Sequence, residues 1–171
     1  MKSRLAATVF ALVSSVVPMA HGGSFSAAIN IADEVDAAET GMRVYPGATP
    51  VGKRGRENDS ANLQFSFGEY GLKVIAAKLR SADSPERIAS FYRSELARFG
   101  EVLDCGAPDR AATSQPNDKK SQAIGCDGDK PRKNGMLYKA GRKSDQHVVE
   151  IKPHADGSEF SLVHVRVRSP D

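Results

Sequence analysis

The chain has 171 residues, of which 26% are charged and 6% aromatic, and it contains no tryptophan. Its formal charge is +3, but Lys2 and Arg4 lie in residues 1–22, called the leader below, so residues 23–171 carry 22 basic against 21 acidic side chains. Nucleic-acid-binding domains usually have a strongly basic surface or aromatic platforms for bases. The composition therefore argues against nucleic acid as a partner.

The leader has the layout of a secretory signal peptide. Lys2 and Arg4 precede a thirteen-residue apolar run at 5–17, and Ala20 and Gly22 place small residues at positions −3 and −1 of a cut after Gly22. The run is shorter than the roughly 20 apolar residues that a membrane-spanning helix needs. We predict a signal peptide at 1–22 and a periplasmic or secreted bacterial protein, with an uncleaved N-terminal tether as the alternative.

Residues 23–42 are predicted to be a flexible acidic spacer. Four acidic residues lie between positions 33 and 39, and the segment before them is small and polar. A short frayed helix is the alternative, because Ile31, Val35 and Ala38 recur at helical spacing. The length of residues 43–171 suits one domain, and we expect a single α+β domain there.

A β-hairpin is the first pattern predicted within this domain. Residues 62–67 alternate between polar and apolar side chains, residues 68–71 contain glycine at both ends, and residues 72–80 form the returning strand. Alternation on both sides of a glycine-containing turn is typical of a hairpin.

The clearest predicted element is an amphipathic helix over residues 85–99. Its apolar stripe consists of Ile88, Phe91, Tyr92, Leu96 and Phe99. Ser84 is expected to cap the first turn, with a capping box of Asp83 and Glu86 as the alternative, and Gly100 is expected to end the helix. We expect this helix to lie across one face of a sheet.

A polar stretch over residues 106–135 follows a short predicted strand at 101–105. It contains almost no large apolar side chain, and we expect a disordered loop, with a binding loop as the alternative. Cys105 and Cys126 are the only cysteines, and an even number in an exported chain indicates a disulfide. Such a bond would stabilise the fold by roughly 3 kcal/mol on the chain-entropy model. Free or metal-binding thiols are the alternative.

Three more strands are predicted at 136–139, 146–152 and 159–168, with a turn at Asp156-Gly157. A two-residue loop would pair Val149 with His164, whereas a three-residue loop would pair Val149 with Val163. We favour the second register because it gathers the apolar residues on one face, namely Val149, Ile151, Val163, Val165 and Val167. The predicted architecture is an antiparallel sheet of five or six strands with one main helix on one face, in the order β-β-α-β-β-β.

Several short segments together resemble a family of small exported bacterial proteins of unknown function. They are residues 44–48 (VYPGA), 83–86 (DSPE) and 91–96 (FYRSEL), together with Asp156-Gly157 and Phe160. The resemblance covers roughly residues 44–168 apart from the polar loop. It implies an envelope or secreted location and a cysteine at each end of a variable loop, and it brings no catalytic residue.

The sequence lacks the usual motifs of catalysis and ligand binding. It has no GxSxG, HExxH or CxxC segment and no phosphate-binding glycine loop. His147 and His164 can approach each other across the last hairpin, with Asp145 or Asp156 nearby, but they lack the close spacing of metal-binding histidines. The prediction is therefore no catalytic residue, no cofactor and no metal.

One strand carries a candidate anion-binding face. His164, Arg166 and Arg168 alternate along residues 159–168, so they share one face, and Lys152 can join them from the neighbouring strand. We expect this face to lie opposite the valines. Such a row could hold an anionic group such as a lipid headgroup or an acidic glycan, but the favoured interpretation is the solvated face of a one-sided sheet, or charges that protect an edge strand.

These observations predict a non-enzymatic exported domain that binds an unknown component of the bacterial envelope. Membrane contact is expected only through the leader or weakly through the anion-binding face, and the pattern specifies no oligomeric state. The alternatives are a hydrolase whose acids or histidines converge only in the fold, and a carrier with an apolar cavity between helix and sheet.

Overall fold

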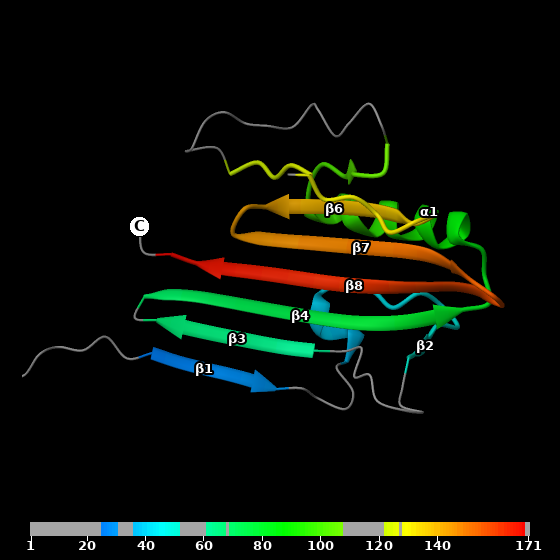
Figure 1. The fold of residues 1–171 in the computed structure, drawn as a ribbon. Helices are drawn as coiled ribbons and strands as arrows, with labels where there is room; N and C mark the ends of the chain where they lie inside the picture. Colours follow the sequence, from blue (N-terminus) through cyan, green and yellow to red (C-terminus); the bar gives the residue numbers. More distant parts are fainter. Residues whose placement is uncertain are drawn as a thin grey trace, which may run out of the picture.

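The computed structural model describes residues 25–30, 36–51, 61–67, 69–107, 122–126 and 128–169. The predicted signal peptide lies outside the described residues. These described residues form one open antiparallel sheet with a single α-helix on one of its faces (Figure 1). Within the described ranges, no helix has both the length and the apolar character needed to cross a membrane.

The predicted α+β class is confirmed, but the sheet contains more strands than predicted. Seven strands follow the order β1-β3-β4-β8-β7-β6-β5, and β2 also pairs with β4. In chain order the elements are β1 (Phe25–Asn30), the 3-10 helix η1 (Ala37–Thr40), β2 (Thr49–Pro50), β3 (Ala61–Phe67), β4 (Tyr70–Ser81), α1 (Pro85–Leu96), the 3-10 helix η2 (Ala97–Phe99), β5 (Leu103–Asp104), β6 (Met136–Arg142), β7 (Asp145–His154) and β8 (Gly157–Arg168).

The described part of the predicted spacer is bound to the domain. β1 pairs with β3 along its whole length, so the sheet begins at Phe25 and not after residue 42. The carboxylate of Asp36 accepts a hydrogen bond from the Ala38 backbone and caps η1. Ala37 and Met42 are buried in the core. The described parts of this segment are therefore attached to the sheet by the pairing of β1 and by the burial of Ala37 and Met42.

The first predicted hairpin is confirmed, with a tighter turn. β3 and β4 pair in a register that sets Phe67 opposite Tyr70, so the connection contains only residues 68 and 69. β4 then continues to Ser81 and pairs with β8 on its other side. This central position explains why β4 is one of the longest strands.

The predicted helix is present, and its apolar stripe packs on the sheet. Ile88, Tyr92 and Leu96 are fully buried, and the flanking aromatic residues Phe91 and Phe99 pack partly buried against the same core. Ser84 occupies the N-cap position as predicted, but its side chain makes no cap hydrogen bond. Gly100 ends the helical segment as predicted, directly after η2, with a φ of 135°.

The carboxylate of Asp83 is used elsewhere. It accepts hydrogen bonds from the Tyr45 hydroxyl at 2.7 Å and from the Arg87 guanidinium at 2.8 Å. The hydrogen bond from Tyr45, followed by that from Arg87, lowers the pKa of Asp83. Asp83 therefore joins the helix start to the segment before β2 instead of capping the helix.

Glu95 is a buried charge on the sheet side of α1. Its carboxylate accepts hydrogen bonds from the backbone and the guanidinium of Arg43, at 3.1 and 2.8 Å, and forms an ion pair with Arg98. Burial alone would raise the pKa of Glu95, but the hydrogen bonds from Arg43 lower it below its usual range. The ionised carboxylate thus joins the segment after η1 to the helix.

The register of the last hairpin differs from both predicted alternatives. Its loop contains two residues, Ala155 and Asp156, and the strands pair Val149 with Leu162. Gly157 has a φ of 131°, and a Cβ there would lie 2.2 Å from the Ser81 carbonyl oxygen. Only glycine therefore allows β8 to begin beside the end of β4.

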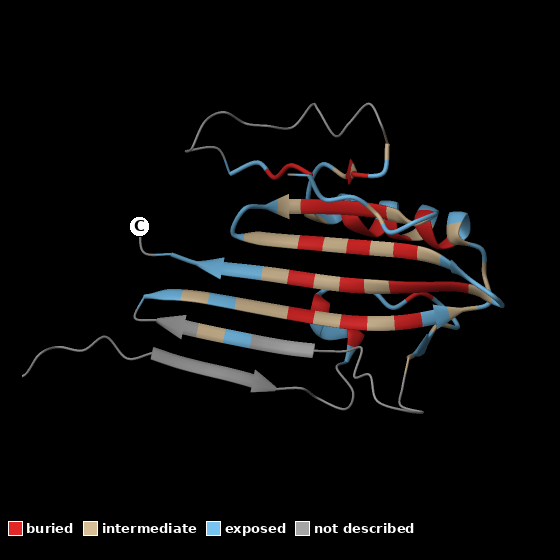
Figure 2. Cartoon of the chain, viewed as in Figure 1, coloured by how far each residue is buried: buried red, intermediate tan, exposed pale blue. Residues whose placement is uncertain are grey.

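This register reverses the predicted faces of β8. We call the side of the sheet covered by α1 the helix face and the other side the far face. Phe160 and Leu162 are buried on the helix face, whereas Val163, Val165 and Val167 lie on the far face, contrary to the prediction. Figure 2 shows the resulting alternation of buried and less buried residues along β7 and β8.

The predicted disulfide between Cys105 and Cys126 is confirmed. Both cysteines are buried in a small second core, together with Leu103, Ile124 and Leu137. Residues 108–121 of the predicted loop lie outside the described residues. Residues 122–126 are tied to the sheet, because the Lys139 ammonium donates to the Gly125 carbonyl oxygen at 3.0 Å.

Candidate metal-binding site

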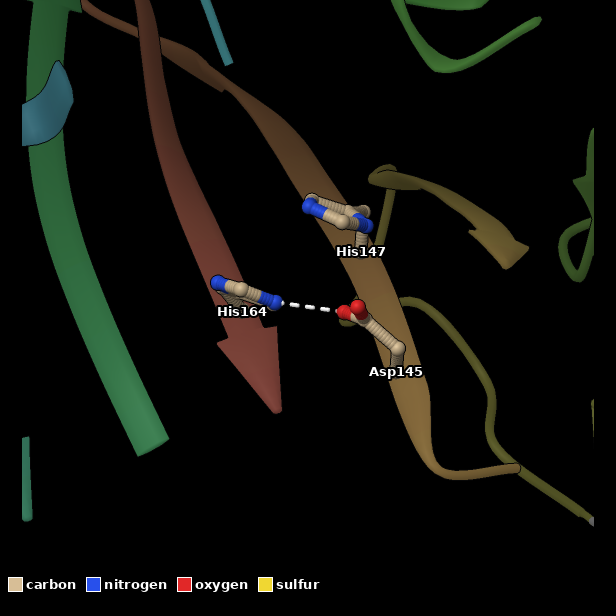
Figure 3. A group of neighbouring side chains, drawn as sticks. All are labelled: Asp145, His147 and His164. Atoms are coloured by element: carbon tan, nitrogen blue, oxygen red, sulfur yellow. Dashed lines mark hydrogen bonds and ion pairs between the residues drawn. The ribbon is translucent and has the colours of Figure 1, made fainter. Parts of the chain in front are cut away.

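The strand register brings two histidines and one carboxylate together on the helix face. His147 and His164 stand directly opposite each other on β7 and β8. Asp145 precedes His147 by two positions and therefore shares its face. Each of the three side chains offers a ligand atom, and these atoms lie within 4.8 Å of one another (Figure 3).

His147 is held rigidly and is buried, with an exposed fraction of 5%. Its ring stacks between those of Phe99 and His164, with centroids 3.6 and 4.3 Å away. The ring also forms a hydrogen bond with the Thr40 backbone. The Nδ1 atom is buried and has no hydrogen-bond partner within the described part of the chain.

The buried ring of His147 is electrically neutral at ordinary pH. Burial, together with the neighbouring His164, lowers the pKa of His147 to about 4. A neutral imidazole has a free lone pair on one ring nitrogen, and leaving such a buried atom unpaired costs about 1–3 kcal/mol. An atom of this kind is well suited to bind an external partner.

His164 and Asp145 complete the cluster and connect it to solvent. The Nε2 atom of His164 lies 2.6 Å from an oxygen of Asp145, and the other oxygen of Asp145 lies 3.7 Å from Arg166. His164 is 9% exposed, whereas the side chain of Asp145 is 45% exposed. A ligand could therefore approach from the side of Asp145.

The donor set of two imidazoles and one carboxylate matches known preferences of metal ions. Imidazole nitrogens suit zinc, copper, nickel and iron, whereas calcium and magnesium prefer oxygen ligands alone. Sites with three protein ligands also leave at least one coordination position free for water or another ligand. The cluster can thus hold a divalent transition-metal ion.

The structure keeps three of the four residues of the predicted anion-binding face on one side of the sheet and places Lys152 on the other. His164 is buried on the helix face, and Arg166 and Arg168 follow it on the same face towards the end of β8. Lys152 lies on the far face, opposite Glu159, with the two charged groups 2.5 Å apart. The cause is the register, which places Lys152 and His164 on opposite sides of the sheet.

The sequence indicates that His147 and His164 can approach each other with Asp145 or Asp156 nearby, but it predicts no metal site because the two histidines lack close spacing. The structure brings Asp145, and not Asp156, to the two histidines. The preferred register paired His147 with Val165, so it did not set the two histidines directly opposite each other. Comparison with protein-family models, curated proteins and solved structures finds no match to this chain. The resemblance to small exported bacterial proteins therefore stays a prediction.

Proposed function

We propose that this protein is an exported, non-enzymatic binding domain whose ligand is a divalent transition-metal ion. The ion would be bound by Asp145, His147 and His164. The observation that carries the proposal is the buried Nδ1 atom of His147, which lacks a partner beside a second imidazole and a carboxylate. Export is supported by the leader and by the disulfide between Cys105 and Cys126.

The packing around the cluster favours binding over structural support alone. Phe99 and His164 fix the ring of His147 from both sides, so little side-chain freedom is left to lose when an ion binds. His147 is already neutral, and the binding of a metal therefore displaces no proton from it at pH 7. The hydrogen bond between His164 and Asp145 would be exchanged for two metal–ligand bonds.

Zinc titration of the exported protein tests this proposal. In a non-chelating buffer at pH 7, calorimetry is expected to show one Zn²⁺ site. The variants His147→Gln and Asp145→Asn are each expected to weaken binding about a hundredfold, because each removes one of three ligands. Co²⁺ should give a visible absorption spectrum with the native protein and lose it in both variants.

The same hairpin supplies matched controls. His154→Gln and Asp156→Asn make identical chemical changes at exposed positions of the β7–β8 turn and should leave the affinity for zinc unchanged. Absence of zinc binding by the native protein, or equal weakening by the two pairs of variants, would contradict the proposal.

A further inference from the structure

One end of the sheet is cationic on the helix face and apolar on the far face. It comprises the β3–β4 turn, the start of β4 and the end of β8, which lie side by side near the C-terminus (Figure 1). On the helix face, Lys73 stands opposite Arg166, and Gly71 stands opposite Arg168. On the far face of the same strands, Leu72 stands opposite Val167.

The cationic side is poorly neutralised by the protein itself. Lys73 and Arg166 are like charges directly opposite each other, an arrangement that destabilises a strand pair. In the part of the chain that the structure describes, Lys73 has no ion pair, and Arg166 has only the contact of 3.7 Å to Asp145. An external anion would relieve this repulsion.

These cations line a shallow hollow, together with Gly71. The hollow has a volume of about 170 Å³, and its polar lining consists of Gln64, Lys73, Arg166 and Arg168. A Cβ at Gly71 would lie 3.6 Å from the Nε and Nη2 atoms of Arg168. The Arg168 side chain is held over this glycine, because its Nε donates to the Glu69 carbonyl oxygen at 3.2 Å.

The apolar side of the same end is exposed. Tyr70 is 57% exposed, Leu72 37% and Val167 40%, and all three lie on the far face. Figure 2 shows the start of β4 and the end of β8 mostly in the colours of exposed and half-buried residues. Exposed apolar side chains thus alternate with basic ones along these strand ends, and this combination is typical of proteins that lie on membranes.

We propose that this end of the sheet binds the surface of an anionic lipid membrane. The strand ends would meet the membrane edge-on, so that Lys73, Arg166 and Arg168 contact lipid phosphate groups on the helix face while Tyr70, Leu72 and Val167 on the far face enter the boundary between headgroups and acyl chains. The attraction of basic side chains to anionic lipids and the burial of the apolar ones act together. The proposal goes beyond metal binding and does not depend on it.

Sedimentation with lipid vesicles tests the proposal, using the exported protein after removal of the leader. The protein should bind vesicles that contain phosphatidylglycerol, bind pure phosphatidylcholine vesicles much more weakly, and dissociate at high salt. The double variant Lys73→Gln/Arg168→Gln should weaken binding about tenfold. Arg166 is kept because it contacts Asp145, so the double variant should still bind zinc as the native protein does.

The apolar contribution is tested separately, with a control for each change. Leu72→Ser should weaken vesicle binding severalfold, whereas Val44→Ser, at a similarly exposed apolar residue elsewhere, should not. Lys130→Gln/Lys133→Gln removes two exposed charges before β6 and should also have no effect. The proposal would be overturned if the protein did not bind anionic vesicles, or if the two double variants weakened binding equally. It would also be overturned if inorganic phosphate competed with the vesicles while Leu72→Ser had no effect.

Discussion

Replacing Leu162 with alanine is expected to lower the free energy of unfolding by about 4 kcal/mol. Leu162 lies in the middle of β8 on the helix face, where it is fully buried in the main core. The shorter side chain would leave a cavity in this core, which also contains the aromatic rings of Tyr92 and Phe160. Urea unfolding followed by circular dichroism measures the loss.

The adjacent residue provides the control. Val163 lies on the far face and is only partly buried, so Val163→Ala should cost about 1 kcal/mol. The register predicted from the sequence would place Val163 in the core. A larger loss for Val163→Ala than for Leu162→Ala would therefore contradict the register of the structure.

Acid is expected to destabilise the metal-free protein through His147. Burial, together with His164, lowers the pKa of His147 from 6.5 to about 4 in the folded protein. Between these two pH values the unfolded chain binds the proton more readily, and the free energy of unfolding falls as the pH falls. Above about pH 6.5, neutral His147 makes its full contribution to the free energy of unfolding. Below pH 4, about 3 kcal/mol of that free energy is lost.

The variant His147→Gln separates the effect of His147 on the pH dependence of stability from the effects of other titrating groups. With EDTA present, urea unfolding at several pH values should show little change for the variant between pH 6.5 and 4.5. Below that range the variant should still lose stability through Glu159. Burial alone would raise the pKa of Glu159, but hydrogen bonds from Lys152 and Arg80 lower it to about 2. His154→Gln should keep the native profile, and an unchanged slope in His147→Gln would refute the assignment.

Elements whose burial follows a simple period could be predicted from the sequence. The apolar stripe of α1 and the polar–apolar alternation in β3 and β4 predict which side chains face the core. They also predict the ends of these elements to within a few residues. The pairing of Cys105 with Cys126 followed from their number and the expected compartment. These features depend on local patterns and composition, which the sequence shows directly.

The register of β8 could not be predicted because this strand is apolar on both faces. Phe160 and Leu162 on one side compete with Val163 and Val165 on the other, so alternation alone does not select the core face. The register of β8 is set by a contact between residues far apart in the chain, because Gly157 must pass close to the carbonyl oxygen of Ser81. The pairing of His147 with His164, and with it the candidate site, depends on the same contact.

Other missed features also depend on residues far apart in the chain. Asp83 was expected to help cap α1, but its carboxylate binds the hydroxyl of Tyr45, which lies 38 positions earlier. The ring of His147 owes its burial partly to Phe99 from η2. A reading of the chain segment by segment cannot show such contacts.

The bond between Cys105 and Cys126 has a consequence for resistance to proteolysis. It joins the two ends of residues 106–125 into a covalent ring. A protease that cuts one peptide bond anywhere in this ring releases no fragment, because both pieces remain attached through sulfur. Such a nicked molecule would migrate as one species in a non-reducing gel and as two after reduction, and β6, β7 and β8 would keep their connection to the helix.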